Sequence, residues 1–305
     1  MSYQPRRPEQ WQHSWHDGTQ LLLIAADGRQ LLLLTRGRHV NGSLPPDGAA
    51  DIAGVRLPAG RRVGGERRSG RPAEPALWLT APLEQAASTW LALRERLHGT
   101  GLVPLLLSDL PGQPGRPWAS GELRPSGLDP VAGPDVRAVL RDLWDAGVPS
   151  PDEDEADTVE LLIPYSRSFP GLAPATTEQA GAAEFEAAVL AANGPLRIGL
   201  ALAARPADAL VSIGWTGGAN HEATAGSLAV VLRSWEERFG ATLLHLGFDT
   251  MDLLVARPAR SSAATFAVAA EHFAFCPDNV RQGAGSIRGY AEDLLGATRW
   301  SFWWD

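Results

Sequence analysis

Residues 298–305, Thr-Arg-Trp-Ser-Phe-Trp-Trp-Asp, contain four aromatic rings at a place where many chains carry a polar tail. Side chains alternate between the two faces of a β-strand, so an extended segment here puts Trp300, Phe302 and Trp304 on one face and Trp303 on the other. Large rings on both faces are typical of a strand that is covered on both sides. We therefore expect this segment to be the final strand of a sheet.

Residues 196–305 alternate regularly between strand and helix patterns. Strands are predicted at 196–204, 242–248 and 251–257, helices at 227–239 and 262–275, and shorter helices at 206–213 and 286–295. The strands at 242–248 and 251–257 are separated so briefly that they should pair antiparallel. With the short helices set aside, the order is β-α-β-β-α-β, and the predicted fold is an α+β domain of ferredoxin-like order.

A smaller mixed α/β region is predicted to precede this domain. Two leucine-rich runs within residues 20–35 flank Asp27-Gly28, a pair that favours a tight turn, so the region should start with a β-hairpin. A strand, helix and strand over residues 77–107 predict a parallel crossover. A further helix is expected over residues 135–144.

The segment between these regions is predicted to be a connection with little core of its own. It contains the acidic run 152–155, a short apolar run at 159–163 that reads as a strand, and an alanine-rich helix at 178–193 ended by Gly194. The predicted organisation is therefore an N-terminal region at 1–145, the connecting segment at 146–195 and a C-terminal domain at 196–305.

Charge and cysteine content narrow the function classes. Residues 146–305 carry 10 Arg against 20 Asp and Glu, a net charge of −10, and such a surface repels phosphate backbones and anionic membranes. We therefore expect no nucleic-acid partner, and no apolar stretch approaches the roughly 20 residues of a membrane span. Cys276 is the single cysteine, which fits a reducing, cytoplasmic setting, and no His, Asp or Glu spacing predicts a metal site or a bound cofactor.

His272 and Cys276 are the first candidates for chemistry. They lie four residues apart on a predicted helix and so share a face, which is the minimum geometry for a Cys/His nucleophilic pair. Pro277 places Cys276 at the C-terminal end of the helix, where the helix dipole opposes a thiolate. The alternative, which this position favours, is a packed thiol beside a helix-ending histidine.

Asp249 could orient the imidazole of His221 or His272 for acid/base catalysis. The alternative is that Asp249 stabilises the turn between its two strands. The glycine-rich loop 214–221 combines Trp215 with Asn220 and could line a ligand pocket, or it could simply connect two helices.

Asp278 and Asn279 form a polar turn after the helix at 262–275. They could cap the next helical stretch or present an amide to a partner.

Four separated blocks of the chain carry a family resemblance. They are residues 233–240, Arg-Ser-Trp-Glu-Glu-Arg-Phe-Gly; residues 247–250, Gly-Phe-Asp-Thr; residues 269–279, Ala-Ala-Glu-His-Phe-Ala-Phe-Cys-Pro-Asp-Asn; and the aromatic segment 300–305. In this order they resemble the bacterial family called domain of unknown function 4253 (DUF4253), over Leu196 to Asp305. The family has no assigned activity, so the resemblance implies no catalytic or binding residue.

A binding or protein-interaction module is the expected function. No constellation has the spacing of a catalytic or metal site, and 11 Trp exceed what core filling commonly requires. One version is an acidic protein that occludes a basic protein partner, in the manner of bacterial immunity factors. The alternative is an enzyme of undefined class that uses His221, Asp249 or His272 in a pocket roofed by Trp215.

Overall fold

A computed structural model describes residues 42–64, 75–125, 135–150, 155–181, 183–192, 194–221 and 223–305, together with three strands near the N-terminus. These strands, β1 (Gln12–His16), β2 (Gln20–Ile24) and β3 (Gln30–Thr35), form an antiparallel sheet of their own. The pairing of β2 with β3 confirms the predicted hairpin, whose Asp27-Gly28 turn lies outside the described residues.

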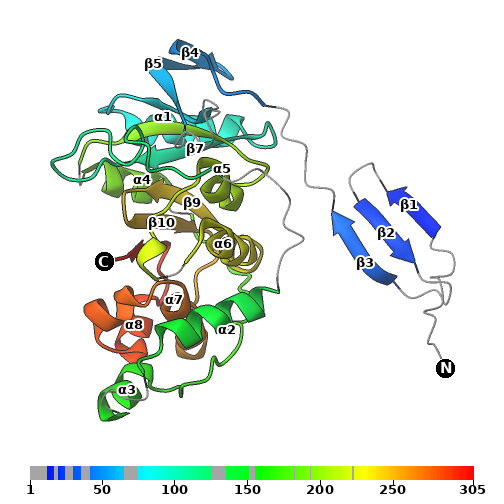
Figure 1. Cartoon of the computed structure of the whole chain (residues 1–305), viewed down its shortest axis with the longest axis vertical. Helices are drawn as coiled ribbons and strands as arrows, with labels where there is room; N and C mark the ends of the chain where they lie inside the picture. The colour runs from blue at the N-terminus through cyan, green and yellow to red at the C-terminus, as the bar shows by residue number, and fades with distance from the viewer. Residues whose placement is uncertain are drawn as a thin grey trace, which may run out of the picture.

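The main body is built on one mixed sheet of eight strands (Figure 1). Its order is β11 (Arg299–Trp303), β10 (Thr250–Val255), β9 (Ala241–Leu246), β7 (Leu102–Leu107), β8 (Arg197–Leu202), β6 (Pro75–Thr80), β5 (Val55–Gly64) and β4 (Gly48–Ile52). β7 and β9 pair in parallel, and the other neighbouring strands pair antiparallel.

The predicted ferredoxin-like order is not confirmed, although the coarser prediction of a mixed fold of helices and strands is. β8, β9, β10 and β11 follow one another along the chain as expected, but β7 lies between β8 and β9 in the sheet. β7 comes from the N-terminal part of the chain and is apolar on both faces, with Leu105, Leu106 and Leu107 fully buried. A strand of this kind is most stable between two hydrogen-bonded neighbours and under two covering layers.

The predicted parallel crossover joins β6 to β7 through α1, but a third strand lies between them in the sheet. Both strands flank β8 and run antiparallel to it, so they are parallel to each other but are not neighbours. The sheet thus combines strands from residues 1–145 with strands from residues 196–305, and the three-part division of the chain stays a prediction.

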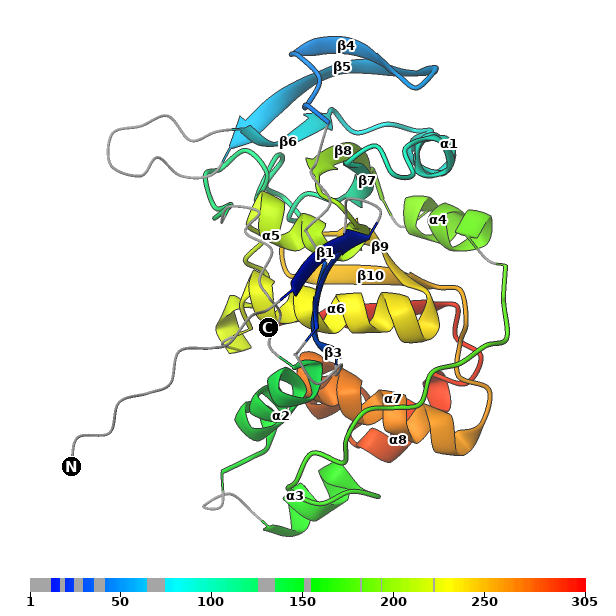
Figure 2. The same cartoon turned by 90° about the vertical axis from the view of Figure 1, so that its right-hand side faces the viewer.

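Helices cover both faces of the sheet (Figure 2). α1 (Ala86–Arg96) and α4 (Ala183–Ala192) pack side by side on one face. The core on the other face contains α5 (Ala209–Ile213), α6 (Ala225–Phe239), α7 (Ser262–Phe275), α2 (Val136–Gly147) and α8 (Ile287–Asp293). The remaining helical segments are α3 (Glu155–Leu162), η1 (Pro206–Asp208), η2 (Ala219–His221) and a π-helical turn η3 (Asn279–Ala284).

Capping residues in the sequence correctly predicted where two C-terminal helices end. α7 begins after Ser261, whose hydroxyl accepts the N–H of Ala264, and it ends at Phe275 as predicted. α6 ends at Gly240, which adopts the left-handed conformation that glycine accepts without strain.

Two predictions in the connecting segment were wrong. Residues 159–163 do not form a strand, because most of them belong to α3, where the buried residues Thr158 and Leu162 lie four apart and Val159 is exposed. The alanine-rich helix starts at Ala183 and not at residue 178, since Ala180 donates its N–H to the carbonyl of Ala256 in an extended stretch. Of the acidic run 152–155, residues 152–154 lie outside the described residues.

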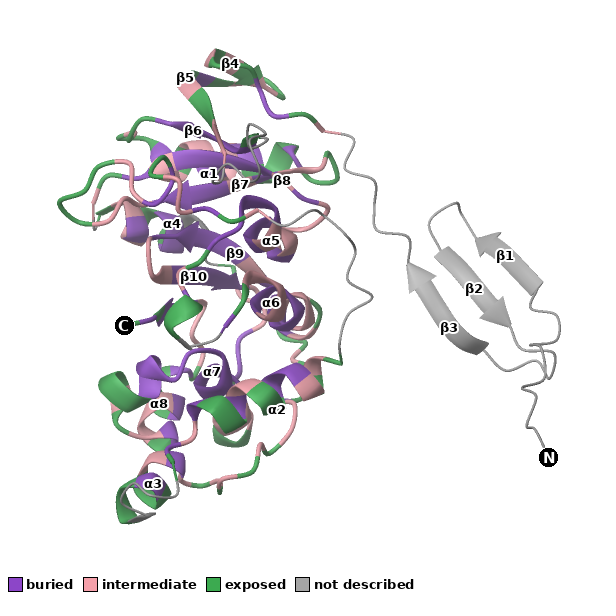
Figure 3. Cartoon of the chain, in the orientation of Figure 1, coloured by how far each residue is buried: buried purple, intermediate pink, exposed green. Residues whose placement is uncertain are grey.

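The aromatic segment is the edge strand β11, and it is covered on one face only. Trp300, Phe302 and Trp304 are each 1% exposed, whereas Trp303 on the opposite face is 36% exposed. The alternation is therefore as predicted, but the covering of both faces is not. Figure 3 shows that the buried residues concentrate in the central strands and in helices such as α7.

Tryptophan content does not mark an interaction surface in the described residues. Eight tryptophans are fully buried: Trp78, Trp90, Trp118, Trp144, Trp215, Trp235, Trp300 and Trp304. Most of their indole N–H groups donate to main-chain carbonyls, as Trp90 does to Pro104. The excess of tryptophan thus fills the core, and this argument for an interaction module fails.

A buried charge ties α6 and α7 together. Glu271 is 0% exposed, and its carboxylate accepts from both terminal nitrogens of Arg238, at 2.6 Å each, and from the indole N–H of Trp235 at 2.7 Å. The main-chain N–H of Ala173 donates a fourth hydrogen bond at 2.5 Å. Every oxygen of this carboxylate is satisfied, which is the condition under which a buried charge is tolerated.

Candidate functional site

The glycine-rich loop after α5 is held against the end of β9. Gly214 ends α5 in the left-handed conformation, and Trp215 then turns inward, where its indole N–H donates to the carbonyl of Gly247 at 2.9 Å. A Cβ atom on Gly217 would lie 2.1 Å from the Trp215 ring and 2.6 Å from the carbonyl oxygen of Phe248. Only glycine at 217 therefore lets the loop lie this close to the strand end.

A cavity of about 240 Å³ lies beside this loop. Its lining comes from the loop, the turn after β9 and the end of β11: Thr216, Gly217, Asn220, Phe248, Asp249, Trp304 and Asp305. The edge-on contact of Trp304 with Trp215, at 5.3 Å between ring centroids, ties the loop to this end of β11. The main-chain N–H of Trp304 also donates to the carbonyl of Asp249 at 3.0 Å, so three distant segments form one wall.

Two carboxylates line this cavity. Asp249 is partly exposed and Asp305 is exposed, and neither side chain has an ion-pair or hydrogen-bond partner among the residues that the structure describes. The turn itself is closed by the main-chain bond from Gly247 N to Thr250 O. The guanidinium of Arg116 lies over the Phe248 ring at 4.6 Å, but it pairs with Glu122.

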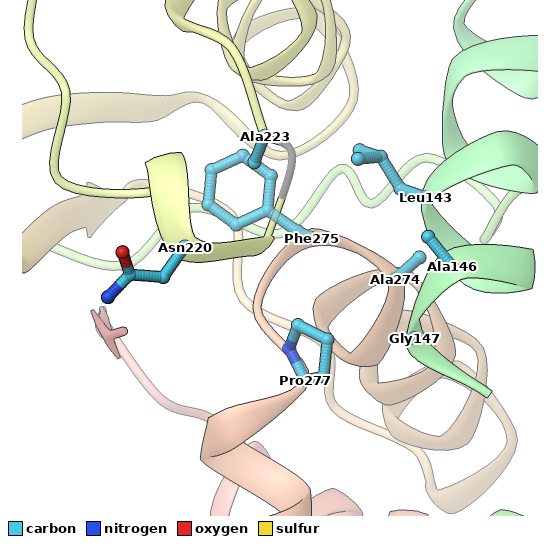
Figure 4. A pocket seen from close by; sticks show the side chains of 8 residues that line it. All are labelled: Leu143, Ala146, Gly147, Asn220, Ala223, Ala274, Phe275 and Pro277. Atoms are coloured by element: carbon cyan, nitrogen blue, oxygen red, sulfur yellow. The ribbon is translucent and has the colours of Figure 1, made fainter. Parts of the chain in front are cut away.

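A second cavity of about 320 Å³ shares Asn220 with the first (Figure 4). Apolar residues of α2 and of the end of α7 form most of its lining: Leu143, Ala146, Gly147, Ala223, Ala274, Phe275 and Pro277. Asn220 lies across the cavity from Leu143 and Ala146, with its amide turned away from them. Asn220 therefore lines both cavities, but its amide does not point across the larger one.

The structure separates the predicted catalytic residues. Asp249 lines the smaller cavity, and the side chain of His221 lies outside the described residues. His272 is fully buried among Trp235, Trp300, Phe302 and Tyr290, and it lines neither cavity. Burial lowers the pKa of His272 well below its ordinary value, so the imidazole is neutral at physiological pH.

Cys276 sits in a setting that suppresses thiol chemistry. Its Sγ donates to the carbonyl of Trp303 at 2.9 Å and lies 3.4 Å from Oδ1 of Asn279. Burial raises the pKa of Cys276 to about 12, and the lowering effect of main-chain hydrogen bonds at Asn279, Trp303 and Asp278 is smaller. The geometry matches the packed-thiol alternative, because a nucleophilic cysteine needs a lowered pKa.

Asp278 and Asn279 are buried and anchor the C-terminal strand. The amide of Asn279 donates to the carbonyl of Ser301 at 2.7 Å and to Tyr290 at 2.9 Å, and Asp278 accepts the main-chain N–H of Asp305 at 3.0 Å. The polar atoms of Asn279 are therefore bonded within the protein. Together with Asp278 they hold the end of β11, which contributes Trp304 and Asp305 to the smaller cavity.

Sequence reasoning missed a polar chain on the face of the sheet opposite α6. Nδ1 of His245 lies 2.9 Å from Oδ2 of Asp252, and Nε2 of the same ring lies 3.0 Å from Oγ of Ser108. A signal was present, because Asp252 interrupts an otherwise apolar strand at 251–255 and His245 interrupts another at 243–246. Ser108 had no such signal, since it lies 137 positions from His245 and meets it only in the folded chain.

No group of three or more His, Cys, Asp or Glu side chains in the described part of the chain is arranged to hold a metal ion. None of the described helices is both long enough and apolar enough to cross a membrane.

The four sequence blocks that carry the family resemblance meet in one place. Trp235 of α6 contacts Phe275 of α7 and both Trp300 and Phe302 of β11, and the β9–β10 turn is bonded to Trp304. Residues 197–305 match the DUF4253 family model, a domain of unknown function. The resemblance expected from the sequence is thus confirmed for the C-terminal third. No match was found among curated proteins or among solved structures.

The DUF4253 segment supplies every residue that lines the smaller cavity. β7, with Ser108 directly after it, and α2, which lines the larger cavity, lie outside that segment.

Proposed function

We propose that this protein is a binding module whose DUF4253 segment takes a cationic side chain of a partner protein into the cavity beside loop 214–221. The observation that carries the proposal is the pair of carboxylates, Asp249 and Asp305, that line this cavity without a partner among the described side chains. A guanidinium or ammonium group would supply the missing charge and its hydrogen-bond donors.

The small volume of the cavity favours a single side chain of a partner protein over a drug-sized molecule as the ligand. Its volume, about 240 Å³, is below the roughly 300–1,000 Å³ of pockets that enclose a drug-sized molecule. An arginine or lysine side chain fits that scale, and the partly exposed Phe248 offers apolar surface for its methylene groups.

The charge of the chain supports a basic partner. Residues 146–305 carry 10 Arg against 20 acidic residues, so the second half attracts positively charged surfaces over the distance that salt screening allows. A protein that occludes a basic partner, as an immunity factor does, is the version of this function that we favour. Such electrostatic matching raises association rates and suppresses wrong partners.

Isothermal titration with two short peptides tests the proposal. Acetyl-Gly-Arg-Gly-amide should bind, with its affinity falling as salt is added, and acetyl-Gly-Gln-Gly-amide should bind at least about tenfold more weakly, a difference of about 1.4 kcal/mol. Asp249→Asn and Asp305→Asn should each weaken the arginine peptide several-fold. Asp293→Asn removes an exposed carboxylate of α8 and should change nothing.

The same titration followed by amide chemical shifts locates the peptide. The largest shifts are expected at Gly217 and Asp249, which line the cavity. Equal affinity for both peptides, or full affinity in the Asp249→Asn/Asp305→Asn double variant, would refute the proposal.

A further inference from the structure

Ser108, His245 and Asp252 form a linear hydrogen-bonded chain. Asp252 Oδ2 lies 2.9 Å from Nδ1 of His245, and Nε2 lies 3.0 Å from Oγ of Ser108. The order is hydroxyl, imidazole and carboxylate, with each ring nitrogen serving one neighbour. This is the order that a general base needs to take a proton from a serine and be held in one orientation while it does so.

Strand pairing sets this arrangement. His245 of β9 and Asp252 of β10 are directly opposite each other, next to a bulge that interrupts the ladder between Asp252 and Leu253. Bulges re-aim side chains and occur often next to active sites. Ser108 follows β7, which runs parallel to β9, and its N–H donates to the carbonyl of Leu246 at 3.1 Å.

Gly247 leaves the space that the hydroxyl occupies. A Cβ atom at this position would lie 3.0 Å from Oγ of Ser108 and 2.2 Å from Oγ1 of Thr250. The hydroxyl thus sits at the carboxyl ends of two parallel strands, the place where sheets of this kind commonly bind ligands.

The surroundings of Asp252 favour its ionised form. Burial raises the pKa of Asp252, but the hydrogen bonds from His245 and Ser301 and the charge of Arg299 outweigh it, so the net pKa is below the ordinary value. An ionised Asp252 accepts the proton of Nδ1, which leaves the lone pair of Nε2 directed at Ser108. Ser108 is partly exposed, so solvent and a small substrate can reach it, whereas His245 is only 6% exposed.

The geometry points to Ser108 as the nucleophile of an acyl-transfer site that acts on small esters, with His245 as its general base and Asp252 as the positioning residue. In the first step, Oγ of Ser108 bonds to the ester carbon while its proton passes to Nε2 of His245. The bond from that carbon to the alkoxide oxygen then breaks, the proton passes from His245 to the alkoxide, and an alcohol leaves. Water attacks the acyl-serine in the same way, which releases a carboxylic acid and restores Ser108.

This site is distinct from the cavity proposed to bind a cationic side chain, and none of its three residues lines that cavity. The competing explanation is that the chain of hydrogen bonds only satisfies buried polar atoms of the sheet. In that case Ser108 would be no more reactive than any other serine. The two explanations therefore predict different rates of reaction with a serine-directed reagent.

An alkyl fluorophosphonate tests the reactivity of Ser108 in the full chain. We expect a single adduct per chain, located at Ser108 by peptide mass spectrometry, and slow hydrolysis of p-nitrophenyl acetate. Ser108→Ala should abolish both, whereas His245→Gln and Asp252→Asn should each slow labelling by about 10²–10⁴-fold, the usual contribution of a positioned base. Ser88→Ala, which removes an exposed serine of α1, should label like the wild type.

Circular dichroism and thermal unfolding should be recorded for each variant, so that loss of labelling is compared only among folded chains. Failure of the folded wild-type chain to form an adduct at Ser108 would overturn the inference by itself. Labelling of folded His245→Gln at the wild-type rate would overturn it as well. The adduct is measured without any cationic peptide, so this test and that of the cation site can fail separately.

Discussion

The buried carboxylate of Glu271 provides the sharpest test of how α6 and α7 are joined. Replacing it by glutamine keeps the shape of the side chain but removes the charge and turns one acceptor into an NH₂ donor. All four groups around it, two from Arg238 and one each from Trp235 and Ala173, are donors. Glu271→Gln must therefore leave some donors unpaired and set N–H groups against one another.

The magnitude follows from burial. The Glu271 side chain is 0% exposed and that of Arg238 is 14% exposed, so water cannot replace the lost partner of the guanidinium. Breaking a buried ion pair from one side costs about 3–5 kcal/mol. That loss is a large part of the roughly 5–15 kcal/mol that typically separates folded and unfolded chains.

Urea unfolding followed by tryptophan fluorescence and by circular dichroism measures this loss, and the two transitions should coincide before a free energy is extracted. Glu237→Gln is the matched control, because that side chain is 70% exposed and its partner Arg205 lies 3.2 Å away. The control should lose less than about 1 kcal/mol.

A double-mutant cycle then isolates the pair. Arg238→Met leaves the carboxylate buried without its cation, so combined with Glu271→Met it should cost clearly less than the sum of the two single changes. The indole N–H of Trp235 stays unpaired in the double variant, so stability should not return fully. A loss below about 1 kcal/mol for Glu271→Gln, or strict additivity in the cycle, would refute this account.

Three further predictions concern the C-terminal core. The pKa of His272 is lowered in the folded chain, so as the pH falls the imidazole is protonated first in the unfolded chain. The unfolding free energy should therefore decrease as the pH falls below 6.5. His272→Phe should flatten the fall in unfolding free energy between pH 6.5 and 5.5, by up to about 1.4 kcal/mol per pH unit, and an unchanged slope would contradict this. Trp300→Ala should cost about 3–5 kcal/mol in urea unfolding and Trp303→Ala less than about 1, because only the first ring is buried; similar costs would argue against the facing of β11. With its pKa raised to about 12, Cys276 should react with iodoacetamide at pH 8 about 1,000-fold more slowly in the folded chain than in urea, and comparable rates would show that the thiol is accessible.

Much of the local structure of residues 196–305 could be predicted because its signals are local. A serine cap and a following proline bound α7, a left-handed glycine ends α6, and strict alternation decides which rings of β11 face the core. The apolar run at 159–163 was predicted as a strand, but so short a run does not distinguish a strand from a helix. In the folded chain most of it is helical, with Leu162 buried against the rest of the protein.

The candidate sites depended on contacts that no local pattern encodes. Asn220 and Asp249 line one cavity, but nothing in the sequence indicated that Asp305 joins them or that His272 is enclosed by aromatic rings. The tryptophan count suggested an exposed surface, yet indole groups satisfied by main-chain carbonyls can be buried at little cost.

The sequence by itself determined which segments are strands and helices in the C-terminal third, which faces of them are apolar, and which family that third matches. Only the tertiary structure decided that β7 inserts between β8 and β9 and thereby brings Ser108 to His245. The reason is that hydrogen bonding between strands is the same for every apolar partner, so neighbours in a sheet are chosen by the packing of the whole chain and not by the residues of either strand alone.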